Sequence, residues 1–151
     1  MASIGSLIGD RPVYAVQRDS SVLEAARCMA ERNIGAIPVL EEKRLVGIVS
    51  ERDVIRKVVA EKLDPGAVQV GEIMTRELVV ADASENEESC LRKMKAAHCR
   101  HLPVVSGETL VGILSLRDLL QGELTEREEK LEFLTSYMFH LPPDSEKRPG
   151  A

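Results

Sequence analysis

The sequence lacks any long apolar run. Its longest apolar stretches, such as residues 45–49, are only about strand length, whereas a membrane-spanning helix needs about 20 predominantly apolar residues. The first residues, MASIGSLIGDR, also lack the charged-then-apolar order of a secretory signal. We therefore expect a soluble cytoplasmic protein that makes no use of a membrane.

A basic surface is missing as well. The net charge of −5 is spread along the whole chain instead of collecting in a positive stripe, so nothing in the sequence is suited to neutralising a phosphate backbone. This argues against nucleic acid as a partner. With 151 residues, 44% of them hydrophobic, the chain can bury the core of one domain, or of two very small ones that share a core.

Cysteine and histidine are scarce. Cys28, Cys90 and Cys99 are widely spaced with no CxxC pair, which is typical of reduced core thiols. His98, Cys99 and His101 do cluster, but only alternate residues of a strand face the same way, so at most Cys99 and His101 converge. With no third ligand nearby in sequence, we expect no metal site.

Recognisable catalytic patterns are also absent. The chain contains no Ser-His-Asp arrangement and no phosphate-binding P-loop, and none of its three histidines has an identifiable nucleophile beside it. We therefore do not expect an enzyme.

What the sequence does contain is an internal repeat with a period of 65 residues. Residues 37–54, IPVLEEKRLVGIVSERDV, align without a gap with residues 102–119, LPVVSGETLVGILSLRDL. Nine of the sixteen positions from 38 to 53 are identical, where chance would give about one. The chain therefore carries a duplication.

Each repeat is predicted to run β-α-β-β-α. Short β-branched runs at 13–16 and 78–81 precede stretches with helical spacing of apolar residues at 20–32 and 85–97. Ser21 with Glu24, and Ser84 with Glu87, have the pattern of helix-capping boxes. Strands at 36–40 and 45–49 form a hairpin, which has a counterpart in the second repeat.

A helix is expected to begin after each hairpin, at Ser50 and at Ser115. The first runs to about Lys62, before Asp64, Pro65 and Gly66 end it. Beyond the period lies an additional amphipathic helix, whose apolar residues have helical spacing. These residues are Leu131, Phe133, Leu134, Tyr137, Met138 and Phe139.

The expected organisation is therefore repeat one at 3–64, repeat two at 68–122, a C-terminal helix at 123–140 and a flexible polar tail at 141–151. One repeat of about 60 residues has too small a core to stand alone. The two repeats should pack sheet to sheet as a single α+β module. We expect the C-terminal helix to strap a dimer or to dock a partner.

The duplicated unit resembles the cystathionine-β-synthase (CBS) domain. The resemblance covers about residues 3–121 and rests on the Pro-Val of the hairpin followed by LVGIVSERD or LVGILSLRD, on VGEIMTRELVVA at the start of repeat two, and on CRHLPVV. It implies a stand-alone CBS pair, or Bateman module, of a kind that often forms homodimers through the helices after the hairpins.

The resemblance also implies a regulatory ligand. Such pairs commonly bind adenosine-containing molecules, namely AMP, ATP, NAD(H) or S-adenosylmethionine, in two clefts between the repeats, with no obligatory cofactor. Ser50 with Asp53, and Ser115 with Asp118, match the family pattern in which the aspartate accepts the ribose hydroxyls and the serine faces phosphate. The alternative is that each pair merely caps a helix.

The remaining candidates follow from chemistry and position. Arg52, Arg117 and Arg100 are candidate contacts for phosphate or carboxylate, since a guanidinium can bond two oxygens at once; the alternative is that they are simply solvated beside a helix start. The resemblance adds His101, because family members often carry polar ligand contacts just before this Pro-Val. Repeat one has only Gly35-Ala36 where repeat two has Arg100-His101, which predicts unequal clefts. Gly47 and Gly112 either border the clefts or mark a bend. Apolar walls for adenine are expected from Tyr14, Ile37, Pro38, Val80, Leu102 and Pro103, beside Val13 and Val79.

Two functions remain open at this point. The first is a sensor that binds an adenosine ligand and signals to an unidentified partner protein; the alternative is a ligand-free structural module that dimerises and displays its C-terminal helix. A homodimer is expected in either case, because the helices after the hairpins carry apolar residues on more than one face. These residues are Val54, Ile55, Val58, Val59, Leu63, Leu116, Leu119 and Leu120.

Overall fold

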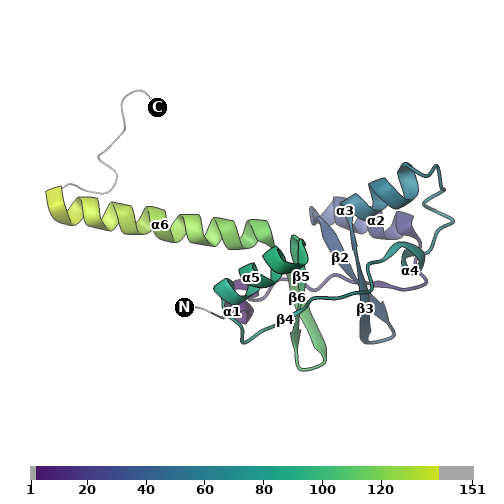
Figure 1. Ribbon diagram of the computed structural model, residues 1–151, viewed down its shortest axis with the longest axis horizontal. Helices are drawn as coiled ribbons and strands as arrows, with labels where there is room; N and C mark the ends of the chain where they lie inside the picture. Colours follow the sequence, from purple (N-terminus) through teal and green to yellow (C-terminus); the bar gives the residue numbers. More distant parts are fainter. Residues whose placement is uncertain (1–2, 140–151) are drawn as a thin grey trace. The chain divides into compact units, whose positions relative to one another are not determined.

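The computed structural model describes residues 3–139, without the side chains of residues 122–126, 133 and 135–139. It consists of two units, the first ending at Ser115 and the second beginning at Leu116. The first unit contains two three-stranded sheets and their covering helices (Figure 1). The second contains a single long helix, which we describe by itself.

The two sheets have the same topology. In the first repeat β1 (Val16–Gln17) is parallel to β2 (Ala36–Glu41), which pairs antiparallel with β3 (Arg44–Ser50). In the second, β4 (Ala81–Asp82), β5 (His101–Ser106) and β6 (Thr109–Ser115) repeat this order. Each hairpin has a register shift at equivalent positions, 39/40 and 104/105. The duplication in sequence is therefore a duplication of structure, although β1 and β4 are shorter and begin later than the predicted 13–16 and 78–81.

The helices between the strands begin at equivalent caps. At the start of α2 (Val22–Arg32), Ser21 Oγ accepts a hydrogen bond from the Glu24 N–H at 3.1 Å. At the start of α5 (Glu87–Ala97) the cap is Asn86, 65 residues after Ser21, whose Oδ1 accepts from the Ser89 N–H at 2.8 Å. The predicted cap at Ser84 is therefore wrong, because α5 begins two residues later than predicted and the Ser84 hydroxyl donates to the Asp82 carboxylate instead.

Short helices at the start of each repeat cross to the other repeat. The Ile4 N–H of α1 (Ile4–Ile8) donates to the Glu85 carbonyl at 2.8 Å, and the Val70 N–H of α4 (Val70–Ile73) donates to the Ser20 carbonyl at 2.8 Å. Val70, Ile73 and Met74 are members of the core of the first repeat. Each repeat thus depends on a segment of the other, as expected for units too small to fold alone.

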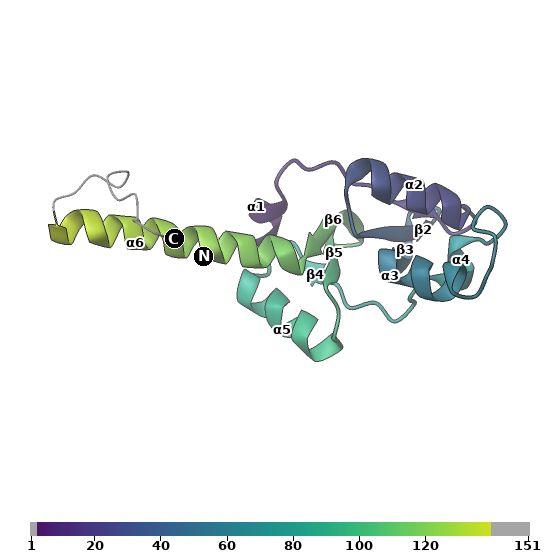
Figure 2. The same cartoon turned by 90° about the horizontal axis from the view of Figure 1, so that it is seen from above.

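The central strands are buried on both faces. Ala36, Ile37, Pro38 and Val39 of β2 are all buried, although alternate residues of a strand face opposite sides. The helices of the repeat cover one face, with Ile37 and Val39 in their core. The two sheets lie side by side (Figures 1 and 2), and the predicted sheet-to-sheet module is confirmed.

After β3 the chain forms one turn of α-helix, α3 (Glu51–Val54), and then a π-helical segment, η1 (Ile55–Val59). The Ala60 N–H donates to the Ile55 carbonyl at 2.8 Å, the five-residue step of a π-helix. Val58 is fully buried, whereas Ile55, Val59 and Leu63 are 61%, 63% and 47% exposed. The segment therefore presents an uncovered apolar stripe.

In the second unit, α6 (Leu116–Phe139) is one continuous helix. The C-terminal helix expected from residue 123 is continuous with the helix after β6, since a single glycine such as Gly122 costs a helix interior only about 1 kcal/mol. Leu131 and Leu134 are exposed. The side chains of Phe133, Tyr137, Met138 and Phe139, and the whole of His140, lie outside the described parts. Among the described residues no helix is long and apolar enough to cross a bilayer.

Candidate ligand cleft

A cleft of about 690 Å³ lies between the two repeats of the first unit, within the range of small-molecule sites. The first repeat contributes the end of its hairpin and the start of α3. The second contributes the chain between α4 and β4 and the turn before β5. The lining residues are Gly35, Ile48, Ser50, Glu51, Arg52, Asp53, Thr75, Glu77, Leu78, Val79, Ala97, His98, Cys99, Arg100, His101 and Pro103.

Ser50 and Asp53 form a reciprocal cap at the start of α3. The Ser50 N–H donates to Asp53 Oδ2 at 2.9 Å, and the Asp53 N–H donates to Ser50 Oγ at 3.1 Å. Lys57 Nζ lies 3.2 Å from Asp53 Oδ1. Because a carboxylate has about four acceptor positions, Asp53 has room for further hydrogen bonds from a ligand in the cleft.

The cleft also brings together several groups that can bear positive charge. Arg52 comes from the first repeat, and His98, Arg100 and His101 come from the second. Opposite them Gly35 has no side chain, and a Cβ at this position would lie only 3.2 Å from His101 Nε2. Repeat one has Gly35 where repeat two has Arg100. Because Gly35 has no side chain, it leaves room for the imidazole of His101.

Part of the cleft wall is an irregular stretch of chain that follows α4. Thr75 exchanges two main-chain hydrogen bonds with Ile48 of β3, at 2.9 and 3.1 Å, and Glu77, Leu78 and Val79 follow it along the cleft. This wall belongs to repeat two in sequence but is held against the hairpin of repeat one.

Cys99 is one of the residues that line the cleft. Burial raises the pKa of the Cys99 thiol, and burial likewise raises the pKa of Cys90 in the core of the second repeat. His98, Cys99 and His101 all line the cleft, but within residues 3–139 no three side chains of ligating type are grouped so as to hold a metal ion.

Seven of the candidates named from the sequence line this cleft: Ser50, Arg52, Asp53, Val79, Arg100, His101 and Pro103. Other residues predicted as walls do not line this cleft. Ile37 and Leu102 are fully buried core residues, as is Pro38. Val80 follows the lining stretch without being part of it. Tyr14 packs against the first core with the Arg32 guanidinium 4.9 Å from its ring centroid.

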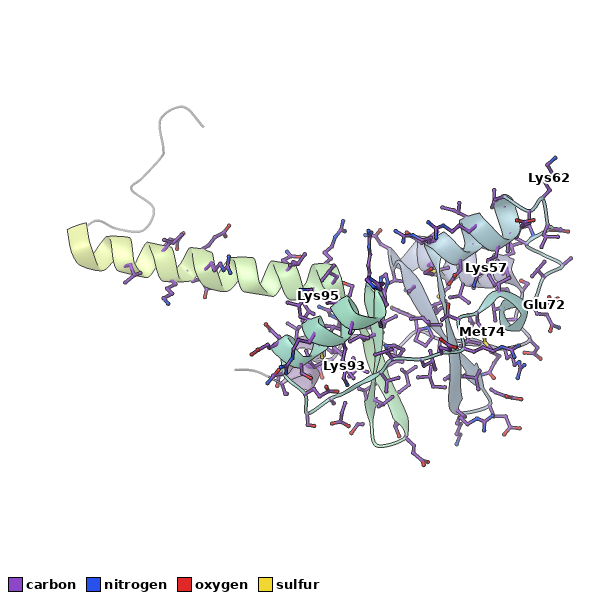
Figure 3. The ribbon with its side chains drawn as sticks, in the orientation of Figure 1. Lys57, Lys62, Glu72, Met74, Lys93 and Lys95 are labelled. Carbon is purple, nitrogen blue, oxygen red and sulfur yellow. The ribbon has the colours of Figure 1, made fainter. Side chains whose placement is uncertain are left out.

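Gly47 does not line the cleft; Met74 packs against it. A Cβ at Gly47 would lie 2.4 Å from Met74 Sδ, so the glycine makes room for the methionine that follows α4 (Figure 3). Gly112 makes room in the same way for Ile8, with 2.9 Å to its Cγ2.

The second predicted set remains a prediction. Ser115 ends β6, whereas Arg117 and Asp118 lie in the first turn of α6, in the other unit. Sequence reasoning missed Glu51, Thr75, Glu77, Leu78 and Ala97, which line the described cleft. None of them repeats at the 65-residue period, so the duplication gave no signal for them.

Proteins with CBS domains in their names are similar to most of this chain. The protein is 30% identical over 125 residues to the CBS domain-containing protein CBSX3, mitochondrial, of Arabidopsis thaliana, covering 80% of this chain but only 61% of that relative. It is 34% identical over 113 residues to the CBS domain-containing protein YhcV of Bacillus subtilis, covering 75% of this chain and 80% of YhcV.

Solved structures share the fold. The CBS domain protein PAE2072 of Pyrobaculum aerophilum, complexed with AMP, matches with a TM-score of 0.71 and 28% identity over 77% of this chain and 88% of its own. The CBS domain pair of MJ0100, in complex with 5′-methylthioadenosine and S-adenosylmethionine, matches with a TM-score of 0.75 and 25% identity over 83% and 98%.

The CBS-domain family model matches this chain twice, at residues 4–60 and 70–124. These two matches correspond to the two repeats, each of which contains one three-stranded sheet. The chain therefore belongs to the CBS-domain family and carries two CBS domains in tandem.

Proposed function

We propose that the module is a regulatory sensor that binds an adenosine-containing ligand in the described cleft and signals its presence to a partner protein. The observation that carries this proposal is the position of Asp53. Its carboxylate is fixed by the start of α3, is 17% exposed, and lines a cleft to which both repeats contribute. AMP and S-adenosylmethionine in the related structures support the ligand class.

The chemistry of the cleft suits such a ligand. A carboxylate can accept hydrogen bonds from both hydroxyls of a ribose, and Arg52 and Arg100 can bind an anionic phosphate or a carboxylate. Leu78 and Val79 supply apolar surface for a base. A ligand held by both repeats would bind only their native arrangement, so binding would stabilise the module as a whole.

The proposal is tested by thermal unfolding with AMP, ATP, NADH and S-adenosylmethionine, using ribose 5-phosphate as a control without adenine. A ligand at 100 times its Kd stabilises the native state by about 2.7 kcal/mol, which shifts the melting temperature by several degrees. We expect at least one adenosine compound to do so and the control to have no effect. If none of the four shifts the melting temperature, the ligand-free structural module is the better description.

We also propose that the protein is a homodimer, paired through the exposed stripe of Ile55, Val59 and Leu63. Ile55 and Val59 are the first and last residues of η1, and Leu63 follows the turn after it; all three are exposed, and dimerisation would bury them. Light scattering at micromolar concentration should give a dimer mass, and Ile55→Asp should lower it to that of the monomer. The matched control is Leu91→Asp, which changes an exposed leucine of α5. A wild-type monomer would contradict this proposal.

A further inference from the structure

Residues 74–79 form an irregular wall of the cleft that Asp53 also lines. They follow α4, and Thr75, Glu77, Leu78 and Val79 line the cleft. A stretch without regular secondary structure has few main-chain bonds to fix its path. Apart from the two bonds between Thr75 and Ile48, its conformation depends on what holds the two ends.

At the first end the anchor is Lys57 of η1. Its Nζ donates to the Ile73 carbonyl at 2.8 Å and lies 3.2 Å from Asp53 Oδ1. Ile73 is the residue immediately before the wall, and Asp53 lines the same cleft. An ammonium group has three donors, so a single side chain, Lys57 (labelled in Figure 3), links the start of the wall to the proposed ribose-binding carboxylate.

At the other end the anchor is Lys93 of α5. Its Nζ donates to the Val80 carbonyl at 2.9 Å and to Glu85 Oε2 at 2.8 Å. Glu85 in turn accepts from the Asp82 N–H at 2.6 Å and from Ser89 Oγ at 2.7 Å. The carbonyl directly after the wall is thus bound to an ammonium whose own position is fixed by a hydrogen-bonded carboxylate.

Neither lysine belongs to the duplicated pattern. The residues 65 positions away are Gly122 for Lys57 and Cys28 for Lys93. Both lysines nevertheless end on main-chain carbonyls that flank the same six residues. Two unrelated elements therefore supply the same chemistry to the two ends of one wall.

We propose that Lys57 and Lys93 are positioning residues that set the conformation of the cleft wall, and that Lys57 also holds Asp53 at the correct distance from it. The effect on ligand affinity rests on the proposed function of the cleft. A ligand that contacts both Asp53 and the wall binds more tightly when they are already in place, because less ordering is left to the binding step.

The first test needs no ligand. Hydrogen exchange is measured in the full chain for Lys57→Met and Lys93→Met, with Lys62→Met and Lys95→Met, which change exposed lysines near each site, as controls. We expect Lys57→Met to speed exchange at Met74 and Thr75, and Lys93→Met to speed exchange around Ala83, each about fivefold. Unchanged exchange in both variants, or equal acceleration in the controls, would overturn the proposal.

The second test is calorimetric titration of AMP and of S-adenosylmethionine. Lys57→Met should weaken binding about fivefold while Lys62→Met has no effect, and Lys57→Arg should restore part of the affinity because it keeps the charge. Equal affinity of wild type and Lys57→Met would overturn the positioning role. If the wild type binds neither compound, the proposed function fails, and the exchange experiment alone decides whether the lysines hold the wall.

Discussion

The side chains of Ser50 and Asp53 each accept a hydrogen bond from the other residue's main-chain N–H at the start of α3. The N···O distances are 2.9 Å to Asp53 Oδ2 and 3.1 Å to Ser50 Oγ. The same two side chains line the cleft between the repeats. Capping and ligand binding, which the sequence presented as alternatives, are therefore compatible roles of one pair. The cap fixes the carboxylate in the position from which it would meet a ligand.

Comparing Ser50→Ala with Ser21→Ala separates the capping role from the binding role. Ser50→Ala and Ser21→Ala each remove a side-chain acceptor at a helix start, so each should lower the free energy of unfolding by about 1 kcal/mol in urea. Ser50 lines the cleft, whereas Ser21 does not. Only Ser50→Ala should also reduce the thermal shift given by a bound nucleotide, and an equal reduction in Ser21→Ala would show that the cap acts on binding through stability alone.

Packing of Gly47 against Met74 predicts a steric penalty. The added methyl group in Gly47→Ala would lie 2.4 Å from Met74 Sδ, and such overpacking costs about 1–3 kcal/mol. In a Met74→Ala background the same substitution should cost much less, because the obstructing side chain is gone. Chemical unfolding of the four proteins measures the coupling. Gly66→Ala, whose Cβ would have its nearest neighbour at 3.3 Å, is the control, and strictly additive costs would contradict the packing role.

Cys99 provides a chemical probe of the cleft. Since burial raises the pKa of its thiol, less thiolate is present at pH 8 than in a free cysteine, and alkylation by iodoacetamide should be slow and accelerate as the pH rises. A bound ligand should slow the reaction further, because Cys99 lines the cleft. Cys28, which packs against the core of the first repeat, should be unaffected. Mass spectrometry of the alkylated peptides would contradict this account if saturating nucleotide left the Cys99 rate unchanged.

Glu85 should make the free energy of unfolding fall at acidic pH. Burial opposes ionisation of Glu85, but hydrogen bonds from Lys93, Ser89 and the Asp82 main chain outweigh it and lower the pKa. A carboxyl whose pKa is lower in the folded state stabilises the fold above its ordinary value of about 4.3, and this stabilisation is lost as pH falls through the folded pKa.

Urea unfolding of wild type and Glu85→Gln between about pH 3 and 6 measures this contribution. The wild type should lose stability more steeply than Glu85→Gln as the pH falls. Glu61→Gln changes an exposed carboxylate and should leave the slope as in the wild type. Identical slopes in all three proteins would mean that Glu85 does not contribute to acid sensitivity.

Local signals in the sequence predicted most of the fold. The hairpins and the helices α2 and α5 follow from alternation, helical spacing and the duplication. The edge strand β1 was misplaced because its two residues are defined by parallel pairing with Val39 and Leu40, which are distant in sequence. Nor did any local signal indicate the π-helical turns of η1 or the continuity of α6 through Gly122.

The sequence predicted part of the site from each repeat. Ser50, Arg52 and Asp53 follow the hairpin motif and could be found from the repeat, and Arg100 and His101 precede the second hairpin. The irregular stretch with Thr75, and its anchor Lys57, depends on the crossing of α4 from one repeat to the other. Tertiary packing brings these residues together, so neither spacing nor composition could indicate them.

The central claim is tested most directly by calorimetric titration of AMP, ATP, NADH and S-adenosylmethionine into wild type, Asp53→Ala and Asp64→Ala, with Asp118→Ala reporting on the second predicted site. Asp64 is an exposed carboxylate that does not line the cleft. We predict saturable binding of at least one compound to the wild type, unchanged in Asp64→Ala and weakened about tenfold to a hundredfold in a still folded Asp53→Ala. Binding to Asp53→Ala with wild-type affinity, or no binding of any of the four compounds to the wild type, would contradict the account.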